Sequence, residues 1–256
     1  MREAGKTPFS YNEFYSRHLV MREIGVEGQR KLASSKVAVV GVGGLGTASS
    51  LYLALAGVGH LRLIDGDLVE AKNLHRQVLY KPGDIGKPKA EVAAERLSEA
   101  NPFIQVEPVN ERLSLENAEE LLGGVNCVVD GLDNMRSRYI VNRTCARLKI
   151  PYVFGAAMGM EGNISVFAPP ETPCLECIFP SVNDNILPRC ETRGVLSSTP
   201  GIIGTMLSME AIKLLVGVGQ TLKGKLMICD FNDMYLTTIE IKKRENCPAC
   251  QNATNT

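Results

Sequence analysis

The chain has 256 residues, of which 45% are hydrophobic and 22% are charged, as is usual for a folded globular protein. Its 28 lysines and arginines balance its 28 aspartates and glutamates, so the formal net charge is zero. General binders of nucleic acid or of anionic membranes need a basic surface, and this balance argues against both classes. The N-terminus has no signal-peptide pattern and no apolar run reaches bilayer length, so we expect a cytoplasmic protein.

Short apolar runs alternate with helical patterns along the first half of the chain. Strands are expected at residues 36–41, 60–65, 104–109 and 125–130, and helices at 43–59, 87–102 and 134–149. A run such as KVAVVG, which is β-branched and ends in glycine, is typical of a buried parallel strand. The alternation predicts an α/β fold with a Rossmann-like, doubly wound, mainly parallel sheet.

In the second half, strand patterns follow one another directly, which predicts an antiparallel C-terminal extension of the sheet. Strands are expected at 151–157, 163–169, 225–230 and 234–241, and a long apolar helix at 199–217. We expect a single domain over residues 1–256, with an N-terminal helical arm at 1–35 and an irregular crossover loop at 170–199. The expected core comprises Val37, Val39, Leu53, Leu55, Leu63, Ile64, Val128, Val129, Ile202, Ile203, Ile212 and Leu215.

A glycine-rich turn lies between the first predicted strand and helix. Gly41, Gly43, Gly44 and Gly46 form this turn, and Asp65 ends the next strand. Such glycines let backbone N–H groups approach a phosphate at a helix N-terminus, and the acid is placed to hold a ribose. The pattern predicts nucleotide binding, although a glycine turn also serves simply to pack a helix on a strand. Taken alone, it favours a dinucleotide-dependent oxidoreductase.

Polar residues are dense just beyond the second predicted strand, where ligands bind in open α/β sheets. Asp67, Asn73, Arg76 and Gln77 lie in this segment. Farther along, Lys89 stands at a helix start, where a cation opposes the helix dipole. A bound polyphosphate would compensate the unfavourable interaction between Lys89 and the helix dipole. Alternatively, the Lys89 side chain points into water, where this interaction costs little.

Asp133 follows the fourth predicted strand and precedes the next helix. A carboxylate in this place is suited to Mg²⁺, which binds one or two carboxylates together with phosphate oxygens. It is equally suited to cap the helix, and the residue pattern alone favours the cap.

These segments resemble the ThiF/MoeB/HesA family, prokaryotic relatives of ubiquitin-activating enzyme. GVGGLG (41–46), LIDGDLVEAKNLHRQ (63–77), GKPKA (86–90) and VDGLDN (129–134) occur in the order and spacing of that family. The resemblance extends over nearly the whole chain, from Tyr15 to Cys250. It implies a homodimeric adenylyltransferase that uses Mg·ATP to adenylate the C-terminal glycine of a small ubiquitin-like (β-grasp) protein ending in Gly-Gly, with release of pyrophosphate.

The resemblance also implies roles for single residues. Asp65 would hold the ribose, Asp133 would hold Mg²⁺, and Arg17 matches an arginine that reaches the phosphates from the partner subunit. Phosphate-binding residues carried over from the family are Asn73, Arg76 and Lys89. Asp67 and Gln77, which belong to the same specific segment, are expected in the nucleotide site as well.

Two C-x-x-C pairs, Cys174/Cys177 and Cys247/Cys250, stand far apart in the chain. In a cytosolic protein such pairs indicate metal ligation before disulfides. Four thiolates suit tetrahedral Zn²⁺, and a closed set of four is structural rather than catalytic. A pair of redox-active or unbound dithiols is the alternative.

Cys190 lies in the predicted crossover loop between Arg189 and Arg193, whose charges would favour a thiolate. The resemblance matches it to a cysteine that bonds covalently to the carrier protein in some members. It is otherwise an inert loop cysteine, and the sequence leaves both roles open. Cys127, Cys145 and Cys229 lie in strand or helix patterns and are expected in the core.

Three rival functions remain at this point: an NAD-dependent oxidoreductase, a non-catalytic scaffold, and an ATP-dependent dehydratase acting on a modified tRNA base. The set formed by Arg76, Lys89 and Asp133 argues against the first two. The paired C-x-x-C motifs and the balanced charge favour a protein substrate over tRNA. The sequence does not name the carrier, and a sulfur donor, if one is used, is expected to be a separate protein.

Overall fold

The computed structural model describes residues 7–184 and 193–251. Its eight strands are β1 (Lys36–Val40), β2 (His60–Ile64), β3 (Gln105–Val109), β4 (Cys127–Asp130), β5 (Tyr152–Met158), β6 (Glu161–Phe167), β7 (Lys225–Asp230) and β8 (Tyr235–Glu240). The main helices are α3 (Gly25–Ala33), α4 (Gly44–Ala56), α5 (Lys89–Ala100), α6 (Ala118–Leu122), α7 (Met135–Leu148) and α10 (Ser198–Val216). Four-residue helices are α1 (Tyr11–Phe14), α2 (Ser16–Leu19), α8 (Leu175–Ile178) and α11 (Pro248–Gln251).

All eight strands form one sheet in the order β3-β2-β1-β4-β5-β6-β7-β8. The pairs from β3 to β5 are parallel, and those from β5 to β8 are antiparallel. The chain reverses its direction of travel at β1, which has β2 on one side and β4 on the other, and this is the switch point where ligands bind in such sheets. The predicted mixed sheet is therefore confirmed.

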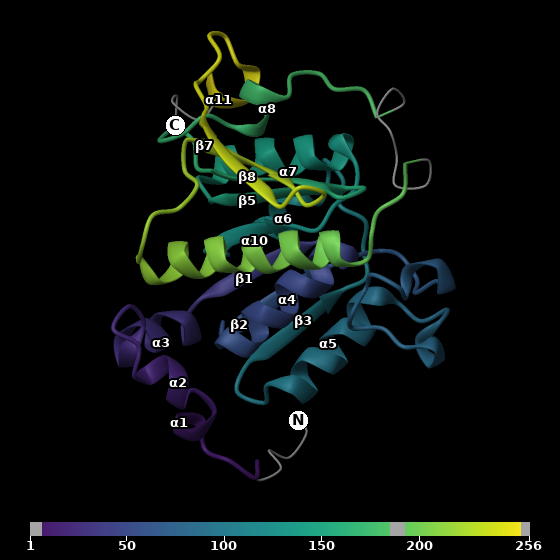
Figure 1. Ribbon diagram of the computed structural model, residues 1–256, viewed down its shortest axis with the longest axis vertical. Helices are drawn as coiled ribbons and strands as arrows, with labels where there is room; N and C mark the ends of the chain where they lie inside the picture. The colour runs from purple at the N-terminus through teal and green to yellow at the C-terminus, as the bar shows by residue number, and fades with distance from the viewer. Residues whose placement is uncertain (1–6, 185–192, 252–256) are drawn as a thin grey trace.

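Helices cover both faces of the sheet (Figure 1). Val37, Val39 and Leu63 point to one face and pack with residues of α4, α5 and α10. Their neighbours Ala38 and Val40 point to the other face and pack with residues of α6 and α7. This alternation of side chains along each strand fixes the register, because a slip by one residue would exchange the two faces.

Two residues of the predicted core, Leu55 and Ile202, are instead exposed, at 36% and 39%. Both lie on helices that are apolar nearly all round, α4 and α10, so periodicity does not tell which side faces outward. The 19-residue α10 passes a length and composition test for a membrane span, with mean hydropathy 1.3. Half of that window is buried inside the protein, as expected of a core helix.

Within its described part, the region 1–35 forms the three short helices α1, α2 and α3. The first, α1, begins with a capping box in which Ser10 accepts from the backbone N–H of Glu13 and the Glu13 carboxylate accepts from the Ser10 N–H. In the region 170–199 the described residues include α8. The helix α6 was not predicted, because five residues are too few for periodicity to show.

Candidate functional site

The glycine-rich turn follows β1 and leads into α4. Gly41 has a φ of +85°, and a Cβ there would lie 2.7 Å from the carbonyl oxygen of Gly131. A Cβ on Gly46 would lie 1.9 Å from the carbonyl oxygen of Gly41. These two positions therefore require glycine, and they bring the turn after β4 against the turn after β1.

Asp65 joins the glycine turn to the segment after β2. One of its carboxylate oxygens accepts from the Val42 N–H at 2.7 Å, and the other accepts from the Asp67 N–H at 2.8 Å. Burial raises the pKa of Asp65, and the nearby charge of Lys89 opposes that effect. Each oxygen retains capacity for a further donor, such as a ribose hydroxyl.

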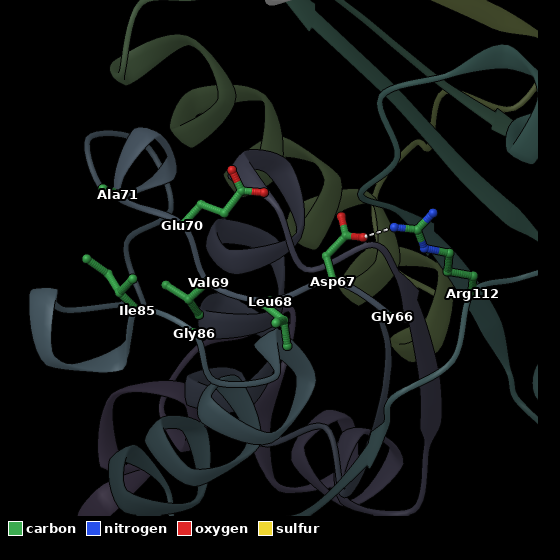
Figure 2. Close-up of a pocket in the computed structure, with 9 residues that line it drawn as sticks. All are labelled: Gly66, Asp67, Leu68, Val69, Glu70, Ala71, Ile85, Gly86 and Arg112. Carbon is green, nitrogen blue, oxygen red and sulfur yellow. Dashed lines mark hydrogen bonds and ion pairs between the residues drawn. The ribbon is translucent and has the colours of Figure 1, made fainter.

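Asp67 lies between two cations. Its carboxylate is 3.4 Å from Lys89 Nζ and 2.8 Å from Arg112 Nη2. Figure 2 shows the Arg112 contact at the edge of a cavity of about 660 Å³, which Gly66, Asp67 and Val69 also line. Lys89 is 8% exposed and Arg112 is 82% exposed, so one cation points inward and the other faces water.

Two amide side chains near the glycine turn are buried with an oxygen that lacks a hydrogen-bond partner within the described residues. Asn73 is 5% exposed and Gln77 is 3% exposed, and the orphaned atoms are Asn73 Oδ1 and Gln77 Oε1. The Gln77 amide nitrogen lies 3.7 Å from where a Cβ on Gly43 would stand. Buried polar atoms of this kind are costly unless a ligand or water satisfies them, and they fit a bound nucleotide.

Arg76 is adjacent to the same turn. Its carbonyl oxygen lies 3.6 Å from the position of a Cβ on Gly44, and its Nη1 donates to the Lys72 carbonyl at 2.8 Å. The same Nη1 is 2.8 Å from His75 Nε2. The guanidinium therefore lies over its own segment, with the glycine turn beside its backbone.

Asp133 is exposed and accepts a hydrogen bond from Asn134 Nδ2 at 3.1 Å. The N-cap of α7 is Asn134, whose side chain accepts from the Ser137 N–H at 2.8 Å. The idea that Asp133 caps this helix is therefore wrong. Asp130, at the end of β4, is fully buried and pairs with Arg138 at 3.0 Å and with the Tyr152 hydroxyl at 2.5 Å.

The four sulfur atoms of the two C-x-x-C pairs lie within 4.8 Å of one another. Neighbouring sulfurs are 3.9 Å apart for Cys174–Cys177, 3.7 Å for Cys174–Cys247 and 3.5 Å for Cys177–Cys250. Zinc–sulfur bonds of about 2.3 Å at tetrahedral angles place sulfurs about 3.8 Å apart. The cluster thus has the dimensions of a four-thiolate zinc site.

Comparison with known proteins decides the family. Residues 15–249 match the model of the ThiF family. The chain belongs to the ThiF family. The SAMP-activating enzyme E1 of Haloferax volcanii is 43% identical over 237 residues, which cover 92% of this chain and 87% of that protein. The sulfur carrier protein adenylyltransferase of Thermus thermophilus is 39% identical over 242 residues, covering 92% and 89%.

Solved structures carry the same fold. The crystal structure of E. coli MccB with ATP superposes with a TM-score of 0.82 at 24% identity, and the match covers 94% of this chain and 75% of that one. At this identity the likeness concerns the fold alone.

Arg17 of this ThiF-family chain lies at the other end of α4 from the glycine turn. Nearby Tyr15 packs against Gly57, where an added Cβ would be 2.7 Å from the ring, and its hydroxyl accepts from Asn101 Nδ2 at 2.6 Å. Gly57 caps the C-terminal end of α4, and thirteen helical residues span about 20 Å. The arm with α1 and α2 therefore lies far from the nucleotide loops of the same chain (Figure 1).

Cys190 lies outside the described residues. Arg193, one of its sequence neighbours, pairs with Glu161 at 3.0 Å. The remaining cysteines behave as expected for core residues: Cys127, Cys145 and Cys229 are buried, and burial raises the pKa of Cys127 to about 12.

One polar residue of the site, Arg112, was not predicted. It stands three residues after β3, so the rule that sites gather at the carboxyl ends of parallel strands would have found it.

Proposed function

We propose that this ThiF-family protein uses ATP to adenylate the C-terminal glycine carboxylate of a small ubiquitin-like protein, with release of pyrophosphate. The proposal is supported chiefly by one arrangement: Lys89, Asn73 and Gln77 are buried near a glycine turn at a helix N-terminus, and the two amide oxygens lack partners within the described residues. A dinucleotide oxidoreductase would explain the turn and Asp65, but it does not explain Arg76, Lys89 and Asp133 as a set for phosphates and Mg²⁺. The two curated relatives, named as an activating enzyme and an adenylyltransferase, agree with the proposal.

Different residues bind the ribose and the phosphates of the nucleotide. Asp65 accepts the ribose hydroxyls, and the backbone of Gly43 and Gly44 faces the phosphates at the N-terminus of α4. Lys89 and Arg76 donate to the phosphate oxygens, with Asn73 and Gln77 supplying amide groups that turn to present N–H₂. Asp67 keeps Lys89 in place in the absence of nucleotide.

The reaction itself asks for positioning rather than proton transfer. A C-terminal carboxylate is ionised near neutral pH, so it attacks the α-phosphorus without a general base, and pyrophosphate leaves with the bonding electron pair. The barrier comes from repulsion between anions and from charge on the transferring phosphorus. Fixed cations and oriented donors lower that barrier most effectively in a site that excludes water.

Asp133 is the carboxylate that would hold Mg²⁺, because it is exposed beside the glycine turn and its helix is capped by other groups. A bound magnesium ion would neutralise charge on the phosphates. The cysteine cluster would hold one structural zinc ion, since its sulfurs already stand at tetrahedral spacing.

The active unit in this proposal is a homodimer. Arg17 stands about 20 Å from its own glycine turn, by the length of α4, so a role at the phosphates requires a second copy of the chain. A two-fold dimer would place each N-terminal arm near the partner's nucleotide.

The carrier belongs to one of two kinds. The names of the two relatives refer to SAMP in one case and to a sulfur carrier protein in the other. A carrier that accepts sulfur after adenylation would need a sulfur donor as a further partner, and Cys190 is the residue to test for a covalent link to the carrier.

The test is ATP–pyrophosphate exchange with candidate β-grasp proteins, combined with mass spectrometry of the carrier. We expect exchange that depends on an intact Gly-Gly tail, and a mass increase of one AMP on the carrier. The Asp133→Ala variant should keep its circular dichroism spectrum and lose exchange. Turnover of a nicotinamide cofactor, with no exchange for any carrier, would overturn the proposal.

A further inference from the structure

Asp133 stands two residues before Met135, the first residue of α7, so its carboxylate is a candidate acceptor for the N–H groups of the first helical turn. The leading N–H groups of a helix have no partner within the helix, and they attract nearby carboxylates. Asp133 is next to them in sequence. If it capped the helix, it would be turned away from any cation at the nucleotide site.

Other side chains already accept hydrogen bonds from those N–H groups. Asp184 accepts from the Met135 N–H at 2.7 Å through one oxygen and from the Arg136 N–H at 2.9 Å through the other. The third, on Ser137, donates to the Asn134 side chain at 2.8 Å. All three N–H groups of the first turn therefore have acceptors, and none of these acceptors is Asp133.

Asp184 is 49 residues from Met135 in sequence, and a short strap brings it there. We use the word strap for residues 179–184, which follow α8. The Tyr139 hydroxyl, on the next turn of α7, donates to the Phe179 carbonyl at 2.7 Å and accepts from the Val182 N–H at 2.7 Å. These two bonds hold the strap against α7 before it reaches the helix start.

The strap starts from the cysteine cluster. Glu176 of α8 lies between Cys174 and Cys177, and it accepts from Asn142 Nδ2 at 3.1 Å and from Arg143 Nε at 2.9 Å. The contacts on α7 thus fall at residues 135–136, 139 and 142–143, a spacing of three to four residues that follows one face of a helix. Along this face the chain runs from the metal cluster to the start of α7.

We propose that Asp184 is a positioning residue for the nucleotide site: it caps α7 so that Asp133, which accepts from the Asn134 side chain, stays off those N–H groups and serves the cation of Mg·ATP. The inference rests on the proposed function, because it assumes that Asp133 serves that cation. In a chain without the Asp184 carboxylate, Asp133 rotates onto the vacant N–H groups of Met135 and Arg136 and is withdrawn from the site.

The test is the Asp184→Ala variant, assayed for the Mg²⁺ dependence of carrier-dependent exchange. We expect the Mg²⁺ concentration at half-maximal rate to rise about fivefold, the effect of one helix cap. The rate at saturating Mg²⁺ should change little, and ATP binding in EDTA should be unaltered. Asp184→Asn, which keeps one acceptor oxygen, should give a smaller rise and serves if the alanine variant folds poorly.

Ser10→Ala is the matched control, because it removes the cap of α1 at the far end of the molecule. It should leave the Mg²⁺ dependence at the wild-type value. Hydrogen exchange at Met135 and Arg136 reports whether these N–H groups gain a new acceptor in Asp184→Ala: they should stay protected if Asp133 takes them and should exchange faster if no group does. An unchanged Mg²⁺ dependence in Asp184→Ala, at either rate of hydrogen exchange, overturns the positioning role. Normal ATP–pyrophosphate exchange in Asp133→Ala instead overturns the assignment of Asp133 as the Mg²⁺ carboxylate, and the inference with it.

Discussion

The two halves of the sheet hold their polar residues by different means. In the half from β1 to β4, the residues of the candidate site follow strand ends, so the parallel topology alone brings them to one edge. In the half from β5 to β8, key polar contacts join segments far apart in the chain. Cys174 meets Cys247, 73 residues farther along the chain.

This difference predicts whether a single substitution mainly affects the reaction or the folding of the protein. A site residue of the parallel half stands on a framework that apolar strands maintain, so its loss should affect chemistry more than folding. A cysteine of the antiparallel half fastens the C-terminal segment, which has little apolar content of its own, so its loss should affect folding first. The following experiments test that division.

The largest effect is expected from loss of the metal cluster. Structural zinc binds small domains with roughly 10–16 kcal/mol, so Cys247→Ser should cost several kcal/mol of stability in the C-terminal half. Purified protein should contain one zinc per chain and the variant markedly less. Hydrogen exchange should quicken in α8, β7 and β8 while β1 and β2 stay protected.

Cys229→Ala is the matched control for that experiment, since Cys229 is buried in β7 outside the cluster. It should retain the zinc and unfold at nearly the wild-type temperature. If freshly prepared, reduced wild-type protein held no zinc, the cluster would be a set of unbound thiols and the division between the halves would lose its basis.

The next largest effect concerns Lys89. Replacing it by methionine removes a buried cation that we propose donates to the phosphates, and the exchange rate should fall about 10²–10³-fold, as for the loss of one preorganised donor. Thermal stability should change little. Lys87→Met is the control, because Lys87 stands two residues earlier, is 57% exposed and pairs with Asp84. Equal losses in both variants would mean that positive charge at this helix start acts non-specifically.

A third experiment tests whether Arg17 acts on the partner's nucleotide. Arg17→Ala and Asp133→Ala should each be inactive alone. After mixing and subunit exchange, half of the dimers are mixed and each has one repaired site, so up to about a quarter of wild-type activity should return. An absence of recovery, with exchange of subunits confirmed by mass spectrometry, would exclude action in trans.

Most strands were predictable because each is a short run with apolar residues in succession or in alternation and with turn residues near its ends. The glycine turn, Asp65 and the segment around Asn73 could be found for the same reason: in a parallel sheet, position in sequence relative to a strand end determines position in space. Family resemblance added the role of Arg17, and it favoured Mg²⁺ binding for Asp133 where the residue pattern alone favoured a helix cap.

What the sequence could not reveal depends on contacts between distant segments. Asp133 and Asn134 are equally good N-cap residues by type. In the structure Asn134 is the N-cap of α7, and Asp184, from far along the chain, accepts from the N–H groups of Met135 and Arg136. The solvent-exposed sides of α4 and α10 could not be predicted either, because a helix that is apolar on nearly every side has no hydrophobic periodicity.

The smallest effect is expected from Arg112. Arg112 and Lys89 both pair with the Asp67 carboxylate. Without Arg112, Asp67 would attract Lys89 more strongly, and its less neutralised charge would repel the phosphates of ATP. Because exposed ion pairs contribute about 0.2–1 kcal/mol, Arg112→Gln should raise the KM for ATP about two- to fivefold with little change in kcat. Steady-state exchange kinetics at varied ATP would measure both constants.

A double-variant cycle separates this indirect effect from direct contact with the nucleotide. In an Asp67→Asn background there is no carboxylate for Arg112 to neutralise, so adding Arg112→Gln should leave the KM for ATP unchanged. A direct contact would cost the same in both backgrounds. The cycle thus distinguishes an arginine that tunes Lys89 through Asp67 from one that binds ATP, and the second result would add Arg112 to the nucleotide site as a ligand-binding residue in its own right.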